Sequence, residues 1–258
     1  MIAQNSSRLE RRWAKIGPAT IAYEVAGSGP PVVLVHGLSG SSRWWRRNIG
    51  ALTPYRRVYV VDLIGFGASR ARQRFVLAEA ASYLTRWMDQ LELERVSLVG
   101  HSMGGLIAAE LAADTPDRVE RLVLVDPAAL PFDAHFMTHA LSLLRELRTI
   151  SPSFLPVLFA DSLRAGPLTF WRAARGLMLA DLRPKLALIS APTLVIWGEH
   201  DALVPLAFAQ QLAHYLRYEE LVVIKGAGHV PMWDRPQEFN RVLTKFLFAD
   251  EGPKTNDE

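Results

Sequence analysis

Short runs of apolar, mostly β-branched residues recur along this chain, and each ends at a turn residue or a polar residue. The runs are apolar throughout instead of alternating with polar positions, which is typical of parallel strands buried on both faces. We therefore expect strands at residues 32–35, 57–61, 96–99, 122–125, 193–197 and 221–224, preceded by an edge hairpin near residues 13–16 and 20–25.

Helical patterns lie between these runs, at residues 76–91, 106–114 and 207–215. This alternation of strands and helices predicts a three-layer α/β fold. One stretch breaks the alternation and carries amphipathic helical segments instead, at residues 135–147, 154–161 and 168–179. The sequence thus predicts a core of residues 1–130 and 191–250, a helical cap inserted at 131–190 and a flexible tail at 251–258.

Composition bounds the class of protein. The chain has 258 residues, of which 50% are hydrophobic and 21% are charged, as in an ordinary globular protein with one large domain. It contains no apolar run long enough for a transmembrane helix, and its first residues lack the apolar stretch of a signal peptide, which favours the cytoplasm. Because cysteine is absent, disulfides, thiolate–metal sites and cysteine nucleophiles are excluded.

Charge gives no sign of a nucleic-acid partner. The formal net charge is +3, and the basic residues are dispersed with acidic residues between most groups. Nucleic-acid binders usually concentrate basic residues on one face. We expect a small-molecule substrate, no stable membrane association, no cofactor and no metal, in a monomer or a homodimer.

The sequence Gly100-His101-Ser102-Met103-Gly104 follows one predicted strand and precedes a predicted helix. A serine between two glycines at such a junction is the sequence form of a nucleophile elbow, a sharp turn that exposes the serine hydroxyl. The glycines lack side chains that would clash across the bend. The amide of Met103 would then point to where an oxyanion forms.

Polar residues follow other strands in a matching order. Because functional groups in α/β sheets gather at the carboxyl ends of the strands, we examined the residues after each run. Leu38 follows the first parallel strand, Asp201 follows the strand that ends near Trp197, and His229 follows the last strand. The order serine, acid, histidine along the chain predicts a triad of Ser102, Asp201 and His229.

The chemistry requires these residue types. A serine hydroxyl is a poor nucleophile until a histidine takes its proton, and an acid must hold the histidine in the right tautomer. Donors for the oxyanion, each worth about 3 kcal/mol, would be the amides of Leu38 and Met103. Glu199 and Asp126 compete with Asp201 as the acid, and His200 competes with His229 as the base.

Other polar residues receive structural interpretations. His36 and His101 flank the predicted site residues and are expected to orient loops, while Asp62 is expected to cap a turn beneath the site. Arginines 43, 46 and 47 could attract an acidic substrate, but are expected to form a solvated surface.

Five segments, at residues 32–37, 62–69, 100–105, 191–205 and 226–239, closely resemble the α/β-hydrolase superfamily, in its esterase-like branch with a helical cap. The resemblance spans nearly the whole chain except the cap. It implies an eight-stranded, mostly parallel sheet with the cap over the active site. It also implies the triad Ser102, Asp201 and His229, with an oxyanion hole formed by Leu38 and Met103.

The resemblance also separates relatives. Haloalkane dehalogenases and epoxide hydrolases of this fold carry an aspartate at the elbow, where this chain has Ser102. Carbon–carbon bond hydrolases usually show a Gly-Pro-Gly-like oxyanion loop, whereas this chain has His36-Gly37-Leu38. Lactonases and thioesterases share the whole triad, and a perhydrolase side activity stays open.

The sequence thus predicts a serine carboxylesterase for short- to medium-chain esters. Carbon–carbon bond hydrolase, lactonase and thioesterase activities are alternatives, as is a non-catalytic ligand sensor. An apolar pocket between sheet and cap would select uncharged acyl chains. The residues expected to line it are Trp44, Phe136, Phe154, Phe159, Phe170 and Trp171.

Overall fold

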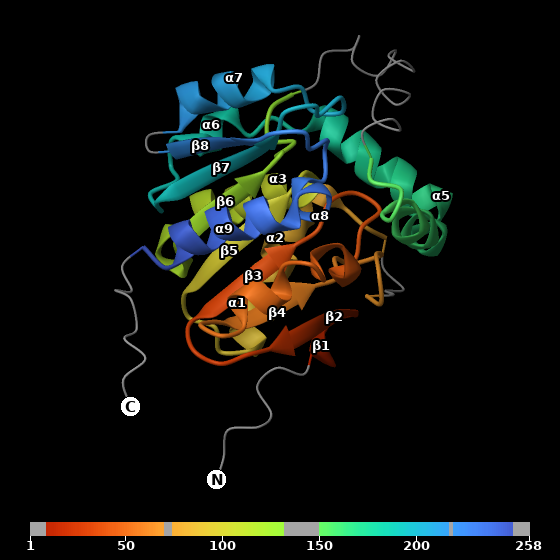
Figure 1. Ribbon diagram of the computed structural model, residues 1–258. Helices are drawn as coiled ribbons and strands as arrows, with labels where there is room; N and C mark the ends of the chain where they lie inside the picture. The colour runs from red at the N-terminus through yellow and green to blue at the C-terminus, as the bar shows by residue number, and fades with distance from the viewer. Residues whose placement is uncertain (1–8, 70–73, 132–149, 217–218, 250–258) are drawn as a thin grey trace, which may run out of the picture.

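One eight-stranded sheet organises the protein (Figure 1). The computed structural model describes residues 9–69, 74–131, 150–216 and 219–249. The strands lie in the order β1-β2-β4-β3-β5-β6-β7-β8. Their bounds are Glu10–Ile16 (β1), Ala19–Ala26 (β2), Pro31–Val35 (β3), Arg57–Val61 (β4), Val96–His101 (β5), Val119–Val125 (β6), Thr193–Gly198 (β7) and Glu219–Ile224 (β8).

The sheet is mostly parallel. Strands β1 and β2 form an antiparallel hairpin, and β2 pairs antiparallel with β4. All other neighbouring strands are parallel, so the carboxyl ends of β3 to β8 lie at one edge of the sheet. The predicted strands and the predicted α/β fold class are confirmed.

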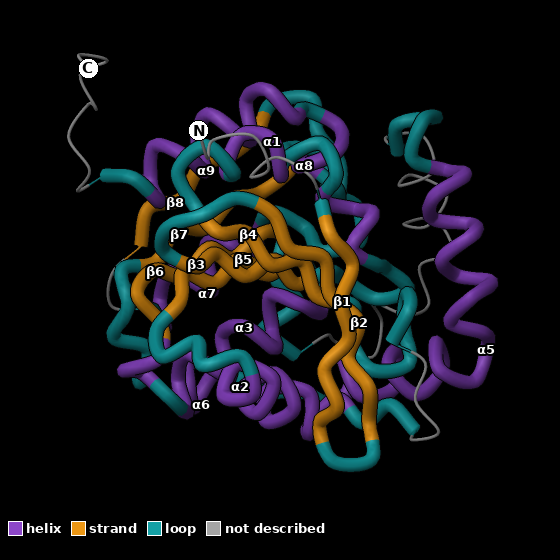
Figure 2. The backbone as a smooth tube through the Cα atoms, turned by 90° about the horizontal axis from the view of Figure 1, so that it is seen from below, coloured by secondary structure: helices purple, strands orange, loops and turns teal. Residues whose placement is uncertain are grey.

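Helices cover both faces of the sheet (Figure 2). Helices α2, α3, α6 and α7 contribute to one hydrophobic cluster, and α1, α8 and α9 contribute to the cluster on the other face. The helices and 3₁₀ turns are η1 (Ser42–Trp45), α1 (Ile49–Leu52), η2 (Leu77–Glu79), α2 (Ala80–Gln90), α3 (Met103–Asp114), η3 (Pro116–Arg118), α5 (Leu155–Leu179), α6 (Arg183–Leu186), α7 (Ala207–Tyr215), α8 (Pro231–Asp234) and α9 (Pro236–Leu247).

Helices α5 and α6 are inserted between β6 and β7. The sequence predicts two helical segments where α5 runs, and α5 is broken in its middle because Gly166 has φ 74° and ψ 160°, outside helical geometry, and Pro167 follows. The predicted segment 135–147, Phe136 and the predicted tail 251–258 lie outside the described residues. The division into core and cap stays a prediction.

The turn from β5 into α3 is unusually tight. Ser102, between the strand and the helix, has φ 53° and ψ −116°, a backbone conformation that non-glycine residues rarely adopt. A Cβ at Gly100 would lie 2.3 Å from the Gly104 carbonyl oxygen, and one at Gly104 would lie 2.5 Å from the carbonyl oxygen of His36. Only glycine permits these approaches.

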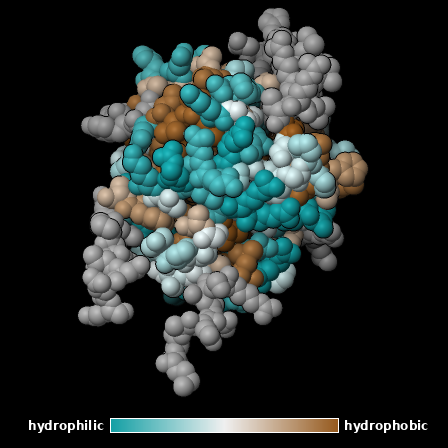
Figure 3. All heavy atoms as spheres, in the orientation of Figure 1, coloured by the Kyte–Doolittle hydropathy of each residue, from teal (hydrophilic) through white to brown (hydrophobic). Residues whose placement is uncertain are grey.

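The surface in the orientation of Figure 3 is largely hydrophilic, with a hydrophobic group over β7 and β8. Leu221 of β8, the strand at one edge of the sheet, is among the exposed hydrophobic residues. Among the described residues, no helix combines the length and the apolar character needed to cross a membrane.

We expect Gly100→Ala to lower the free energy of unfolding by about 2–3 kcal/mol, because the added methyl group overlaps the Gly104 carbonyl and no flexible group can move away. Gly50→Ala is the matched control, since a Cβ there meets nothing within 4 Å. That control should be neutral or stabilising by less than about 1 kcal/mol. Urea unfolding measures both, and equal stabilities would contradict the tight turn.

Candidate active site

Three side chains from three strand ends meet at the carboxyl edge of the sheet. The Oγ of Ser102 lies 3.0 Å from Nε2 of His229, and Nδ1 of His229 lies 2.7 Å from Oδ2 of Asp201. Each of the three residues is less than one-tenth exposed. The structure thus brings the predicted triad residues within hydrogen-bond distance of one another, in the order that acyl transfer requires.

The hydrogen bonds around Asp201 assign the tautomer of His229. Oδ1 of Asp201 accepts from the amides of Leu203 and Val204, each at 2.8 Å. Because Oδ2 is also an acceptor, Nδ1 of His229 carries the proton of their shared bond. The lone pair of Nε2 therefore faces the Ser102 hydroxyl, as a general base needs.

The loops that carry the acid and the base are packed backbone to backbone. A Cβ at Gly198, the last residue of β7, would lie 1.9 Å from the Gly228 carbonyl oxygen. The amide of His200 donates to the Ala227 carbonyl at 2.9 Å. Since both loops are fixed to each other, the separation of Asp201 and His229 follows from main-chain contacts.

Two backbone donors face the same region. The amide of Ser102 is bonded to the Val125 carbonyl at 2.9 Å, which holds the elbow against β6. By contrast, the amides of Leu38 and Met103 donate to no acceptor within the part of the chain that the structure describes. Met103 is also the first residue of α3, where the helix dipole favours negative charge. Their role as oxyanion donors stays a prediction.

Asp126 lies next to this group. It follows β6 with φ 42°, and its Oδ1 accepts from the Gly198 amide at 2.8 Å. Asp126, Asp201 and His229 each offer a ligand atom, and these atoms lie within 4.8 Å of one another. Asp201 and His229 already bind each other through the atoms that a cation would need. The arrangement therefore fits a hydrogen-bonded triad with a second buried carboxylate better than a metal site.

The other competing residues lie elsewhere. Glu199 accepts from the Gly226 amide at 2.8 Å, and His200 lies 3.6 Å from Glu199 with more than half of its side chain exposed. Asp62 accepts from the amides of Ser42 and Ala68, so it fixes the turn after β4.

His36 and His101 are buried and oriented by backbone groups. Nε2 of His36 accepts from the Leu63 amide at 3.0 Å, so its Nδ1 donates to the Gly37 carbonyl. Nε2 of His101 donates to the carbonyl of His229 at 2.7 Å. Desolvation lowers the pKa of His36. Desolvation, with the charge of His229 second, lowers the pKa of His101 well below its usual value.

The predicted pocket aromatics divide into buried and exposed residues. Trp44 and Phe154 are buried, with ring centroids 5.0 Å apart, and Trp44 also lies 5.6 Å from the His101 ring. Phe159, Phe170 and Trp171 are exposed on α5. Their part in substrate binding stays a prediction.

Sequence reasoning missed one buried charge. Asp161 lies in α5 with its side chain fully buried, and it bonds to Ser41 and to Trp44. A signal was present, since Asp161 occupies the same helical face as Val157 and Ala165, which are buried four residues away on either side. An acidic residue in an apolar stripe requires partners.

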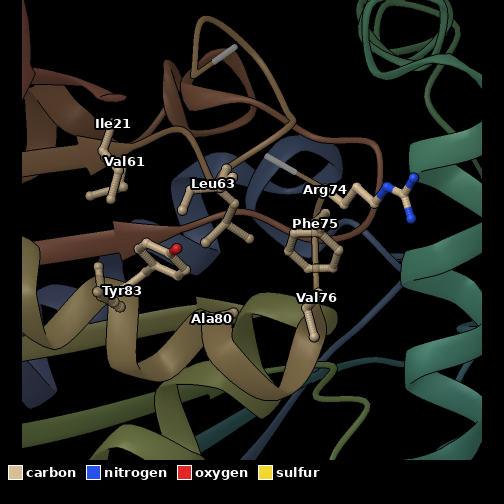
Figure 4. A pocket seen from close by; sticks show the side chains of 10 residues that line it. Ile21, Val61, Leu63, Arg74, Phe75, Val76, Ala80 and Tyr83 are labelled. Carbon is tan, nitrogen blue, oxygen red and sulfur yellow. The ribbon is translucent and has the colours of Figure 1, made fainter. Parts of the chain in front are cut away.

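A separate cavity lies away from the triad, between β4 and the start of α2 (Figure 4). Its volume is about 20 Å³, room for little more than one water molecule. Leu63, Phe75 and Ala80 are among its lining residues, while the Arg74 side chain extends away from it toward α5 (Figure 4). None of the predicted site residues lines it, so it is not a candidate substrate site.

Comparisons with known proteins agree with this geometry. Residues 32–242 match the model described as the alpha/beta hydrolase family. A curated relative from Comamonas testosteroni, named 2-hydroxy-6-oxo-6-phenylhexa-2,4-dienoate hydrolase, is 30% identical, with 88% of this chain and 91% of the relative covered.

Among solved structures, a thermophilic esterase from Thermogutta terrifontis matches with a TM-score of 0.81 at 26% identity, covering 95% of this chain and 100% of the other. The structure of an enzyme described as degrading N-acyl homoserine lactone also matches with a TM-score of 0.81 at 26% identity, covering 91% and 100%. Similar folds thus carry different hydrolytic activities.

The lowered pKa of His101 predicts a pH-dependent stability. Below about pH 6.5 the unfolded chain takes up a proton at this histidine before the folded protein does, so the free energy of unfolding falls with falling pH. We expect His101→Gln to lose less stability than the parent protein between pH 7 and 5, by up to about 2 kcal/mol, in urea unfolding. An identical pH dependence in both proteins would contradict a neutral, buried His101.

Proposed function

Because this chain belongs to the alpha/beta hydrolase family, we propose that it is a serine carboxylesterase that hydrolyses short- to medium-chain esters through an acyl-enzyme intermediate. The observation that carries the proposal is the pair of hydrogen bonds at His229, 3.0 Å to Ser102 and 2.7 Å to Asp201. A base that is bonded to both a hydroxyl and a carboxylate has the geometry for activating a nucleophile.

Acylation begins when Nε2 of His229 takes the proton of the Ser102 hydroxyl as Oγ attacks the ester carbonyl. Asp201 stabilises the resulting imidazolium. The amides of Leu38 and Met103 stabilise the oxyanion, and they suit that role because they have no acceptor among the described residues. His229 then gives its proton to the leaving alcohol.

Deacylation repeats the path with water. His229 removes a proton from the water molecule as it attacks the acyl-enzyme carbonyl, and the same two amides stabilise the second oxyanion. When this intermediate collapses, Ser102 leaves as the alcohol group and regains its proton from His229. The products are a carboxylic acid and the free enzyme.

An uncharged substrate fits the arginines near the site. Arg43 pairs with Asp161, which occupies its guanidinium group. Arg46 and Arg47 lie over the Trp233 ring, 4.7 and 4.3 Å from its centroid. Because these three groups already have partners within the protein, none is held ready for a substrate carboxylate. In this proposal the inserted helices form a cap, with the substrate between cap and sheet.

The second candidate is hydrolysis of a carbon–carbon bond, which the 30% identical dienoate hydrolase favours. A hydroxy-oxo-dienoate is a charged, vinylogous diketone, so it would need a cation in the pocket. Lactones and thioesters require no group beyond the same triad. A panel of p-nitrophenyl esters of increasing chain length, lactones, a thioester and the phenylhexadienoate separates these activities by kcat/KM.

We expect Ser102→Ala to lower kcat for a p-nitrophenyl ester about 10⁶-fold while the protein stays folded. The parent protein should release a burst of nitrophenol followed by sustained turnover, as an acyl-enzyme predicts. Ser190→Ala, at an exposed serine before β7, is the matched control and should keep full activity. Near-full turnover in Ser102→Ala, or a single slow turnover in the parent protein, would overturn the proposal.

The two buried carboxylates should contribute unequally. We expect Asp201→Asn to lower kcat about 10⁴-fold, because the amide no longer favours the correct tautomer of His229. Asp126→Asn should lower kcat by less than about 10-fold, because the bond between His229 and Asp201 remains. Steady-state kinetics on purified variants of matched stability measures both, and a reversed ranking would assign the acid to Asp126.

A further inference from the structure

Asp161 is a fully buried carboxylate that the proposed chemistry does not use. It comes from α5, the helix inserted between β6 and β7. Its Oδ2 accepts from the Ser41 hydroxyl at 2.8 Å and from Nε1 of Trp44 at 3.2 Å, and its Oδ1 pairs with Arg43. Burying a charge is costly unless it is paired and hydrogen-bonded, and this carboxylate has both kinds of partner.

These three partners belong to one short segment. Ser41, Arg43 and Trp44 follow β3, within six residues of Leu38, whose amide is a predicted oxyanion donor. The Ser41 hydroxyl also accepts from the Arg43 amide at 3.3 Å, so the same group begins η1 and donates to Asp161. A single carboxylate from the insertion therefore holds the segment that carries Leu38.

The segment is fixed from its other side by the core. The Ser42 amide donates to Oδ1 of Asp62 at 2.6 Å, and the Gly40 amide donates to the Gly37 carbonyl at 3.0 Å. Leu38 lies between these anchors and the end of β3. Its amide direction thus depends on contacts from both the core and α5.

Contacts continue from Asp161 to the proposed base. The Trp44 ring centroid lies 5.6 Å from that of His101, which neighbours Ser102 in the chain. His101 in turn donates to the carbonyl of His229 at 2.7 Å. The insertion is therefore connected through packed side chains to both the oxyanion segment and the backbone of the base.

We propose that Asp161 is a positioning residue that makes the oxyanion geometry depend on the seating of α5 against the core. This proposal rests on the proposed function, because it assigns the Leu38 amide to oxyanion binding. When Asp161 loses its charge, Arg43 and Ser41 are released and the Leu38 amide shifts from the place where negative charge develops. A displacement of about 1 Å lowers a rate about 100-fold.

The test compares Asp161→Asn, Ser41→Ala and Arg43→Gln with the parent protein, at a temperature well below each melting transition. The first readout is the rate at which a fluorophosphonate labels Ser102, which needs the oxyanion donors but no ester turnover. The second is kcat and KM for a p-nitrophenyl ester. We expect Asp161→Asn to lower the labelling rate and kcat about 10- to 100-fold, with KM within about threefold.

The milder variants should each lower the labelling rate about 3- to 10-fold, and adding Ser41→Ala to Asp161→Asn should cost less than the single effects combined. Asp181→Asn is the matched control, since it removes a carboxylate from an exposed pair with Arg183 in the same insertion and should change neither readout.

A purely structural anchor would lower the melting temperature and leave labelling and kcat unchanged, and that result would overturn the proposal. A rise in KM alone would overturn it too. If Asp161→Asn does not fold, Ser41→Ala and Arg43→Gln decide, and unchanged labelling in both rejects the role. A parent protein that is labelled by the fluorophosphonate but hydrolyses no ester would refute the proposed substrate class while leaving the labelling test of Asp161 intact.

Discussion

The candidate site depends on the close approach of backbones at the turn between β5 and α3. The carbonyl of Gly104 occupies the space where a side chain at residue 100 would begin, and Gly104 itself lies against the carbonyls at the end of β3. This contact holds Ser102 in a strained conformation and sets it beside the segment that carries Leu38. The surrounding sheet and α3 must compensate the strain, which parallel strands buried on both faces can do.

Buried polar groups around that turn are arranged so that none carries an unbalanced charge. The histidines 36 and 101 are held neutral by desolvation, while the carboxylates of Asp201 and Asp161 receive several hydrogen bonds each. A low dielectric strengthens each of these bonds and penalises any missing one. The same condition that makes the site costly to build therefore makes its geometry well defined.

Much of this could be read from the sequence, for a physical reason. Strands buried on both faces are apolar throughout, and residues at their carboxyl ends must meet, so Ser102, Asp201 and His229 could be grouped without coordinates. Helix α9 was not predicted, although it is amphipathic, because the last strand and its histidine drew the interpretation of that region. The positions of the aromatics could not be predicted, because buried Phe154 and exposed Phe159 share one helical pattern. The partners of Asp161 are 117 to 120 residues away in the chain, beyond any local signal.

The break in α5 at Gly166 divides the insertion between the two layers of the protein. Before it, Phe154 and Val157 pack into the hydrophobic cluster on one face of the sheet, and after it, Ala173 and Leu177 pack into the cluster on the other. Because Gly166 interrupts the helix, the two halves meet their neighbours at independent angles. In evolutionary terms the insertion is two modules, so drift in the second half can reshape its surface while the first half, with Asp161, keeps its register on the core.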